Sequence, residues 1–205
     1  MRKFALLASA CVALLFTSIA SAQQGDIVVG GATLLSPYQN NDSVSFHPIP
    51  EKGGTYVNIG GDYIRFKHRL GFSAETAWRD KRATYPDNGE TYRPFFTDFN
   101  VLYAPHIRKK IDVDLFAGIG VATTRFNVPD VTSCSIPTSG CTFFTSSNHF
   151  LEDLGGGVRY YVWQHRLPHV FVRPEVHYYH IQNDIEFSPS NVFRVGVSIG
   201  YTIGH

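Results

Sequence analysis

The chain has 205 residues, 17% of them charged, and a formal net charge of +1 at pH 7. This low, balanced charge argues against a protein that holds nucleic acid electrostatically. Glycine, tyrosine and phenylalanine are abundant, with 18, 11 and 16 copies, which is typical of a strand-rich chain with aromatic side chains at particular positions.

Residues 1–22 have the layout of a secretory signal peptide. Arg2 and Lys3 precede a long apolar run, and an A-x-A cleavage site ends at Ala22. We therefore expect residues 23–205 to be an exported, single-domain chain, since about 180 residues is one domain by the length prior. An uncleaved membrane anchor is the alternative, but the polar residues after the A-x-A site favour cleavage.

Eight later segments carry apolar residues at every second position, which predicts β-strands because successive side chains of a strand point to opposite faces. In chain order they are 26–36, 55–66, 69–79, 93–103, 111–126, 149–162, 169–182 and 191–203. In the last segment Phe193, Val195 and Val197 alternate with Arg194 and Gly196. Outside the leader, no stretch of ten or more residues has a helical period, so we predict an all-β fold.

The predicted connections between these strands alternate between long and short. Long, turn-rich connections follow the first, third, fifth and seventh strands, at 37–54, 80–92, 127–148 and 183–190. Short ones lie at 67–68, 104–110 and 163–168. In an up-and-down meander this places every long connection at one end, an asymmetry typical of bacterial outer-membrane barrels.

The apolar faces suit either the interior of a soluble, lipocalin-like barrel or a lipid-facing surface. The lysines of the strand-forming region fall in connections, and segments of ten or more residues match the roughly 9–11 needed to cross a bilayer at a tilt. Aromatic residues near the strand ends suit the girdles of a membrane barrel: Tyr63, Trp78, Tyr92, Tyr103, Tyr160, Tyr178 and Tyr201. We therefore predict an eight-stranded antiparallel up-and-down transmembrane β-barrel.

Charged residues on the polar faces are expected to meet in the lumen. They are Asp62, Arg69, Glu75, Arg79, Asp98, Asp112, Asp114, Asp153, Arg159, Arg173, Glu175 and Arg194. An eight-stranded lumen is barely wide enough for side chains, and charges removed from water must be paired. We expect three arginines to face three carboxylates: Arg159, Arg173 and Arg194 opposite Glu75, Asp98 and Asp112. A narrow ion path and a catalytic acid–base pair are the alternatives.

Two cysteines, Cys134 and Cys141, lie within one long connection. In an exported protein such a pair predicts a disulfide that closes a small loop. A pair of metal ligands is the alternative, although no histidine or acid lies between them. The third cysteine, Cys11, would suit a lipoprotein signal, but it lies part-way into the apolar run and we assign it to the leader.

An enzymatic site would need a nucleophile within hydrogen-bond reach of a base. The sequence contains no His-x-Ser, the pattern of the lipid A deacylase type. Ser146 or Ser147, together with His149 and Glu152, forms a possible triad near the outer rim. Because His177 and His180 are three residues apart on one predicted strand, they face opposite sides and cannot chelate one metal. We expect no catalytic residue, no metal and no cofactor.

Three features carry a resemblance to a known family: the signal peptide, the FVRPEVHYY segment and the closing FRVGVSIGYTIG. Residues 23–205 resemble the small outer-membrane β-barrel family of OmpA/OmpX-type eight-stranded barrels. The resemblance implies a non-enzymatic, monomeric protein of the cell outer membrane, inserted by the barrel-assembly machinery and surrounded by outer-membrane lipid and lipopolysaccharide. It would display four extracellular loops in a structural or attachment role. A small passive pore, a lipid-active enzyme and a soluble binder are the alternatives.

Overall fold

The structure is a computed structural model that describes residues 23–35, 49–50, 54–65, 69–84, 91–108, 110–130, 141–163, 167–182, 187–188 and 191–203. The long strands are β1 (Gln23–Leu35), β3 (Tyr56–Arg65), β4 (Leu70–Arg79), β6 (Thr91–Tyr103), β8 (Ile111–Asp130), β9 (Cys141–Trp163), β10 (Leu167–Ile181) and β12 (Asn191–Ile203). The short strands are β2 (Ile49–Pro50), β5 (Ala83–Thr84), β7 (His106–Arg108) and β11 (Phe187–Ser188). Within the described residues, no helix is long and apolar enough to cross a membrane.

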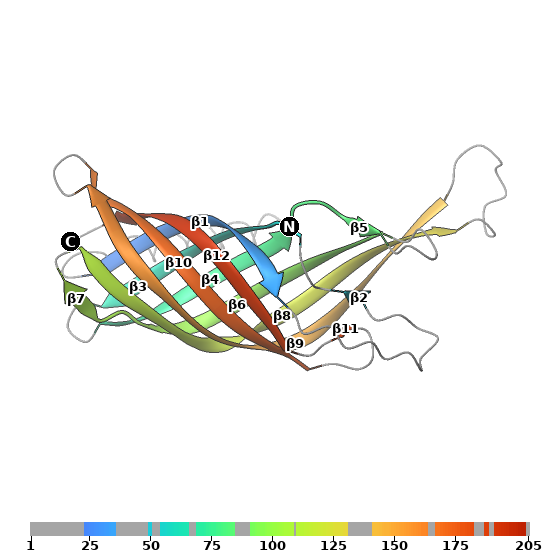
Figure 1. The fold of residues 1–205 in the computed structure, drawn as a ribbon. Coiled ribbons are helices and arrows are strands. Elements are labelled where there is room, and N and C mark those ends of the chain that lie inside the picture. The colour runs from blue at the N-terminus through green and yellow to red at the C-terminus, as the bar shows by residue number, and fades with distance from the viewer. Residues whose placement is uncertain are drawn as a thin grey trace, which may run out of the picture.

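The eight long strands close into one antiparallel barrel (Figure 1). Their order around the ring is β1, β3, β4, β6, β8, β9, β10 and β12, and β12 returns to pair with β1. Closure gives each long strand a hydrogen-bonded neighbour on both sides, which a chain in lipid requires because no water is available to its backbone. The predicted all-β, eight-stranded antiparallel architecture is confirmed.

The apolar face of the barrel points outward. Phe72, Leu154 and Ile199 are 66%, 63% and 60% exposed, whereas Arg194 and Ser198, on the other face of β12, are fully buried. A soluble barrel would have the opposite arrangement, with its apolar face inside and its polar face in water. The orientation of the two faces therefore fits a lipid-facing barrel and does not fit a lipocalin-like binder.

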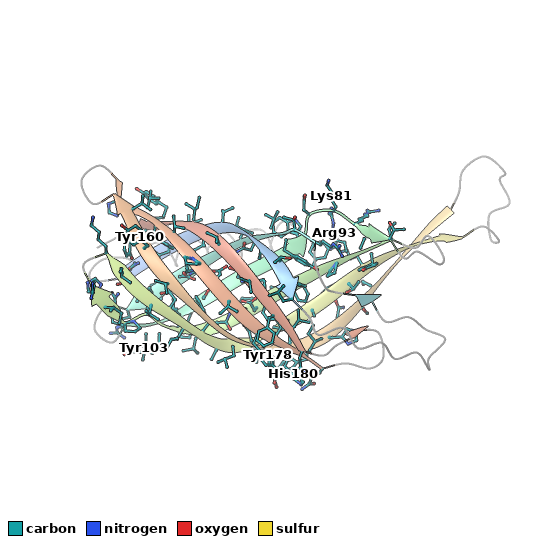
Figure 2. The ribbon with its side chains drawn as sticks, in the orientation of Figure 1. Lys81, Arg93, Tyr103, Tyr160, Tyr178 and His180 are labelled. Carbon is teal, nitrogen blue, oxygen red and sulfur yellow. The ribbon has the colours of Figure 1, made fainter. Side chains whose placement is uncertain are left out.

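Aromatic side chains mark both ends of the outer surface. Tyr103 and Tyr160 are exposed near the short-turn end, and Tyr178 lies toward the end that carries the long connections (Figure 2). Such belts are typical of side chains at the two membrane–water interfaces. Tyr92 was predicted to belong to them, but this prediction is wrong: the side chain is buried and points into the outer mouth of the barrel.

Long and short connections alternate as predicted, but β8 and β9 extend further than their sequence pattern indicates. The pattern ended β8 at residue 126 and began β9 at residue 149, whereas Asp130 still pairs with Cys141. Proline, serine and threonine obscure the alternation in this region, although backbone pairing does not require it. The hairpin projects beyond the other strands (Figure 1). Cys134 lies outside the described residues, so the predicted Cys134–Cys141 disulfide stays a prediction.

Two apolar clusters occupy the ends of the lumen. The cluster nearer the long connections consists of Ala32, Leu34, Tyr56, Phe96, Ala122, Leu151, Tyr179, Ile181 and Val192. The cluster nearer the short turns consists of Ile64, Leu102, Ala104 and Phe116. Between them, the inward-facing positions are mostly polar and charged, and Val28 and Phe171 are buried apolar exceptions. The lumen is therefore a packed core in which most ionic groups lie between two apolar clusters.

Candidate functional site: the ionic core of the barrel

Arg159 on β9 is fully buried and lies at the centre of the part of the ionic core that is nearer the short turns. Its Nη2 lies 2.8 Å from Asp114 Oδ2 and 3.1 Å from Asp62 Oδ2. Its Nη1 also forms an ion pair with Asp26. One guanidinium group thus joins strands β1, β3, β8 and β9. Such pairing is what makes a charge tolerable in a site without water.

Arg173 on β10 lies further along the lumen than Arg159, toward the long connections. Its Nη1 is 2.6 Å from Asp62 Oδ2, and its Nε is 2.8 Å from Glu175 Oε2. The guanidinium carbon lies 5.1 Å from the centre of the Phe116 ring, a cation–π contact with the apolar cluster at the short-turn end. A β-carbon on Gly157 would lie only 3.1 Å from Arg173 Cγ, so this glycine makes room for the arginine stem.

Arg194 on β12 is the third buried arginine. It forms ion pairs with Glu75 and with Glu175, the second at 3.6 Å between Nη2 and Oε1. Asn58 Nδ2 donates hydrogen bonds to Glu75 Oε2 and to Ser198 Oγ, each at 3.0 Å. Neutral amide and hydroxyl groups therefore donate to the carboxylates alongside the arginines.

A second branch of the network contains no arginine. Asn100 Nδ2 donates to Asp98 Oδ1 and to Asp153 Oδ2, both at 2.8 Å. His177 Nδ1 lies 2.9 Å from Asp153 Oδ2, and the Tyr179 hydroxyl donates to Asp98 Oδ2 at 3.2 Å. This branch links β6, β9 and β10 and lies directly against the aromatic cluster at the outer end.

A separate ion pair closes the short-turn end of the barrel. Arg69 Nη2 lies 2.7 Å from Asp112 Oδ2, and Arg69 Nε donates to the Ala104 carbonyl oxygen at 2.6 Å. Arg69 has a left-handed backbone with φ of 55°, which suits its place in the tight turn between β3 and β4. His106 Nδ1 lies 2.5 Å from the other oxygen of Asp112.

The structure brings most of the predicted charged residues into this buried core. They are Asp62, Glu75, Asp98, Asp114, Asp153, Arg159, Arg173, Glu175 and Arg194. Arg69 and Asp112 form the separate pair at the turn end. Arg79 belongs to neither set: it lies at the outer mouth, with its guanidinium carbon 6.0 Å from the centre of the Tyr92 ring.

Of the three carboxylates expected opposite the three arginines, only Glu75 forms an ion pair with them among the described residues. Arg194 does meet Glu75. Asp98, however, receives its hydrogen bonds from Asn100 and Tyr179, and Asp112 pairs with Arg69. Alternation within a strand determines which face a residue occupies, but not which residue it meets across the lumen.

Several members of the core were missed by sequence reasoning. Asp26 is the most important, because it contacts Arg159. The alternation of the first strand was read only from residue 26, whereas β1 begins at Gln23, and the longer pattern places Asp26 on the same face as Val28. The neutral members were missed because only charged residues were considered: Asn58, Asn100, His177 and Ser198.

The possible serine triad is not assembled. Glu152 is exposed on the outer face of β9, while its neighbours Leu151 and Asp153 face the lumen. His149 lies three residues from Glu152 on the same strand and so occupies the opposite face. Within the described residues, histidine, cysteine and acidic side chains also form no group of three or more that could hold a metal ion.

A closed antiparallel barrel with an apolar outer surface and a paired ionic interior defines a β-barrel of the outer-membrane class. The family model described as the outer membrane protein beta-barrel domain matches residues 5–201. The chain therefore belongs to this family and is located in the outer membrane. No curated protein matches the sequence significantly.

Solved structures with the same fold include other small barrels. A major outer membrane protein from Thermus thermophilus has a TM-score of 0.61 at 12% identity, and the match covers 89% of this chain and 100% of that one. Neisserial surface protein A has a TM-score of 0.54 at 14% identity, with coverages of 90% and 98%. Ail, the attachment invasion locus protein of Yersinia pestis, solved with the heparin analogue sucrose octasulfate, has a TM-score of 0.53 at 12% identity, with coverages of 88% and 99%.

Proposed function

We propose that the protein is a non-enzymatic anchor that fixes four outer connections in the outer membrane for surface display, and that its lumen does not conduct ions. The observation that carries this proposal is the packed lumen. Arg159, Arg173 and Arg194 lie across it, and each is bound by carboxylates of other strands. A buried charge held by several partners is part of the scaffold, because moving it would leave those partners unpaired.

The main alternative, a passive pore, needs a continuous water-filled path. An apolar cluster lies toward each end of the ionic layer, and its buried side chains include the rings of Phe96, Tyr179 and Phe116. Phe96 and Tyr179 stack with their ring centres 5.4 Å apart. Apolar side chains at both ends of the lumen exclude hydrated ions, which favours the anchor over the pore.

A role in attachment is supported by the outer end of the molecule. The β8–β9 hairpin extends past the other strands, and β2 pairs with β11, so that the first and last long connections meet. Neisserial surface protein A is a surface protein by name, and Ail is by name an attachment invasion locus protein that was solved with a heparin analogue. These relatives are too distant to assign a receptor, so we propose surface attachment without specifying the partner.

Conductance in planar bilayers tests the proposal. The refolded wild-type barrel should give no discrete current steps. A double variant, Phe96→Ala with Tyr179→Ala, removes both rings of the stacked pair, and we expect it to leak, which provides a positive control. Stable current steps in the wild type, changed in size by Arg173→Gln, would instead assign the protein as a pore.

A further inference from the structure

The outer rim of the barrel carries a group of closely spaced positive charges. Arg93 on β6 and Arg125 on β8 are directly paired positions of neighbouring strands, and both point outward. Like charges directly opposite each other destabilise a sheet, because their β-carbons are about 5 Å apart. Among the residues that the structure describes, neither arginine has a carboxylate in ion-pair contact.

Contacts with neighbouring groups hold Arg93 and Arg125 at the outer rim. Arg93 Nη2 donates to the Asp80 carbonyl oxygen at 2.5 Å, and the Arg125 guanidinium carbon lies 4.8 Å from the centre of the Phe95 ring. Lys81 and Arg82 are exposed in the adjoining segment, which β5 holds against β6. In Figure 2, Lys81 and Arg93 are labelled at the end of the barrel that carries β5.

Among the described residues, the exposed lysines and arginines of the outer end lie on one side of the barrel. Near the outer ends of β9, β10 and β12, the outward-facing positions are Asn148, Glu152, His180 and Asn191, none of which is a lysine or an arginine. A general interfacial belt would surround the barrel, whereas in the described part of the chain the exposed outer cations Lys81, Arg82, Arg93 and Arg125 lie over β4, β6 and β8. We call these four residues the rim cluster. Its restriction to three strands indicates a site for an anion.

An apolar groove lies on the outer surface below the rim cluster. It is lined by Tyr63, Phe72, Ala74, Phe99, Ala117 and Ile119. Arg93 and Phe99 are six residues apart on β6, which is about 20 Å along a strand and about 15 Å of depth at the usual tilt. That depth equals about half the thickness of a bilayer core, the distance that an acyl chain of the outer leaflet reaches.

We propose that the rim cluster binds the phosphate of an outer-leaflet lipid whose acyl chain lies in this groove. The ligand is an anionic, phosphorylated and acylated lipid, the chemistry of lipopolysaccharide. The phosphate would accept hydrogen bonds from Arg93 and Arg125 and remove the repulsion between them. This inference is independent of the proposed anchor function, since a pore would hold a lipid on its outer wall equally well.

The test measures lipid retention in nanodiscs of phosphatidylcholine that contain a minor fraction of bisphosphorylated lipid A. After exchange into a zwitterionic detergent, the lipid A bound per barrel is counted by mass spectrometry. We expect Arg93→Gln with Arg125→Gln to lower retention about tenfold, since each basic side chain near a membrane surface contributes a severalfold gain in binding. The matched control, Arg65→Gln with Arg108→Gln, removes two exposed cations at the opposite end and should retain lipid A as the wild type does.

Three outcomes would overturn the proposal. One is unchanged retention in the Arg93 and Arg125 double variant, and another is an equal loss in the control variant. The third is displacement of lipid A by inorganic phosphate at matched ionic strength, which would indicate a site for free anions. Folding of each variant is checked by its heat-dependent gel mobility. Arg125→Gln alone replaces the double variant if the latter does not fold, with an expected severalfold loss.

A second variant tests the groove. Ala117→Phe fills its floor with an apolar ring and changes no charge, so the barrel remains compatible with lipid. We expect lower retention of lipid A with an unaltered heat-dependent mobility shift. Retention equal to that of the wild type would overturn the placement of the acyl chain in the groove.

Discussion

At the scale of single residues, the lumen shows how a barrel accommodates charge without water. Each of the three buried arginines contacts at least two carboxylates, and small residues make the space for them. Gly157 is one example, because a β-carbon there would lie 3.1 Å from Arg173 Cγ. Ion pairs of this kind do not necessarily stabilise a fold relative to apolar packing, but breaking one leaves a buried charge unpaired.

The ion pair between Arg194 and Glu75 offers a direct test of this argument. We expect Arg194→Met to lower the free energy of unfolding by about 3–5 kcal/mol, because Glu75 and Glu175 lose a shared cation. Adding Glu75→Gln should recover about 1–3 kcal/mol of that loss, since one uncompensated carboxylate is removed. Urea unfolding in lipid vesicles, followed by gel mobility, measures both values.

Arg65→Met is the control for this cycle, because Arg65 is exposed at the turn end. Its effect should remain within about 0.5 kcal/mol. A loss below about 1 kcal/mol for Arg194→Met would contradict the assignment of Arg194 to the structural core.

At the scale of elements, β8 and β9 serve two parts of the molecule. Their halves nearer the short turns form part of the barrel wall. Their halves nearer the long connections form a hairpin that continues to the pair between Asp130 and Cys141. Alternation predicted the halves nearer the short turns, because there one face is buried in the lumen and the other faces lipid. Above the barrel this difference between the faces is lost, so the sequence carries no periodic signal. The end of β8 was therefore placed too early and the start of β9 too late.

We predict that the upper hairpin is dispensable for folding and required for surface attachment. A shortened variant joins Asn127 to Phe144, which are paired positions, through an Asn-Gly turn. Its unfolding free energy should change by no more than about 1 kcal/mol, since loop length has a small effect on stability. Bacteria that display it should adhere less to cultured host cells than bacteria that display the full chain.

The control for this experiment is a variant that keeps the hairpin and replaces Ile107, an exposed residue of β7 at the other end of the barrel, with serine. Its adhesion should equal that of the wild type. Equal adhesion of the shortened and full-length barrels would contradict the assignment of attachment to the hairpin.

At the scale of the whole molecule, the barrel reverses the arrangement of a soluble protein. Its apolar side chains face lipid, and its polar side chains face one another in the lumen. The depth of a residue in the membrane should therefore determine the cost of charging it. Phe99 lies midway along β6, and Tyr103 lies at its interfacial end. Both point outward, at 64% and 44% exposure, so they form a matched pair.

We predict that Phe99→Arg lowers the unfolding free energy in vesicles by about 2–4 kcal/mol, whereas Tyr103→Arg lowers it by about 0–1 kcal/mol. The physical reason is that an arginine at the interface reaches the headgroups, whereas one at mid-depth must distort the bilayer or lose its hydration. Equal costs at the two positions would show that the outer face is not immersed in lipid as assigned.

The sequence by itself determined the class of fold, the face of most residues and the end of the barrel at which the long connections lie. These properties are local, because a period of two residues and a run of turn residues can be read without knowledge of any partner. The tertiary structure decided which groups meet. Arg159 binds Asp26, which lies 133 positions away, and Arg93 lies beside Arg125 because of the register between β6 and β8. Such contacts depend on strand stagger and barrel closure, which arise only when all eight strands have paired.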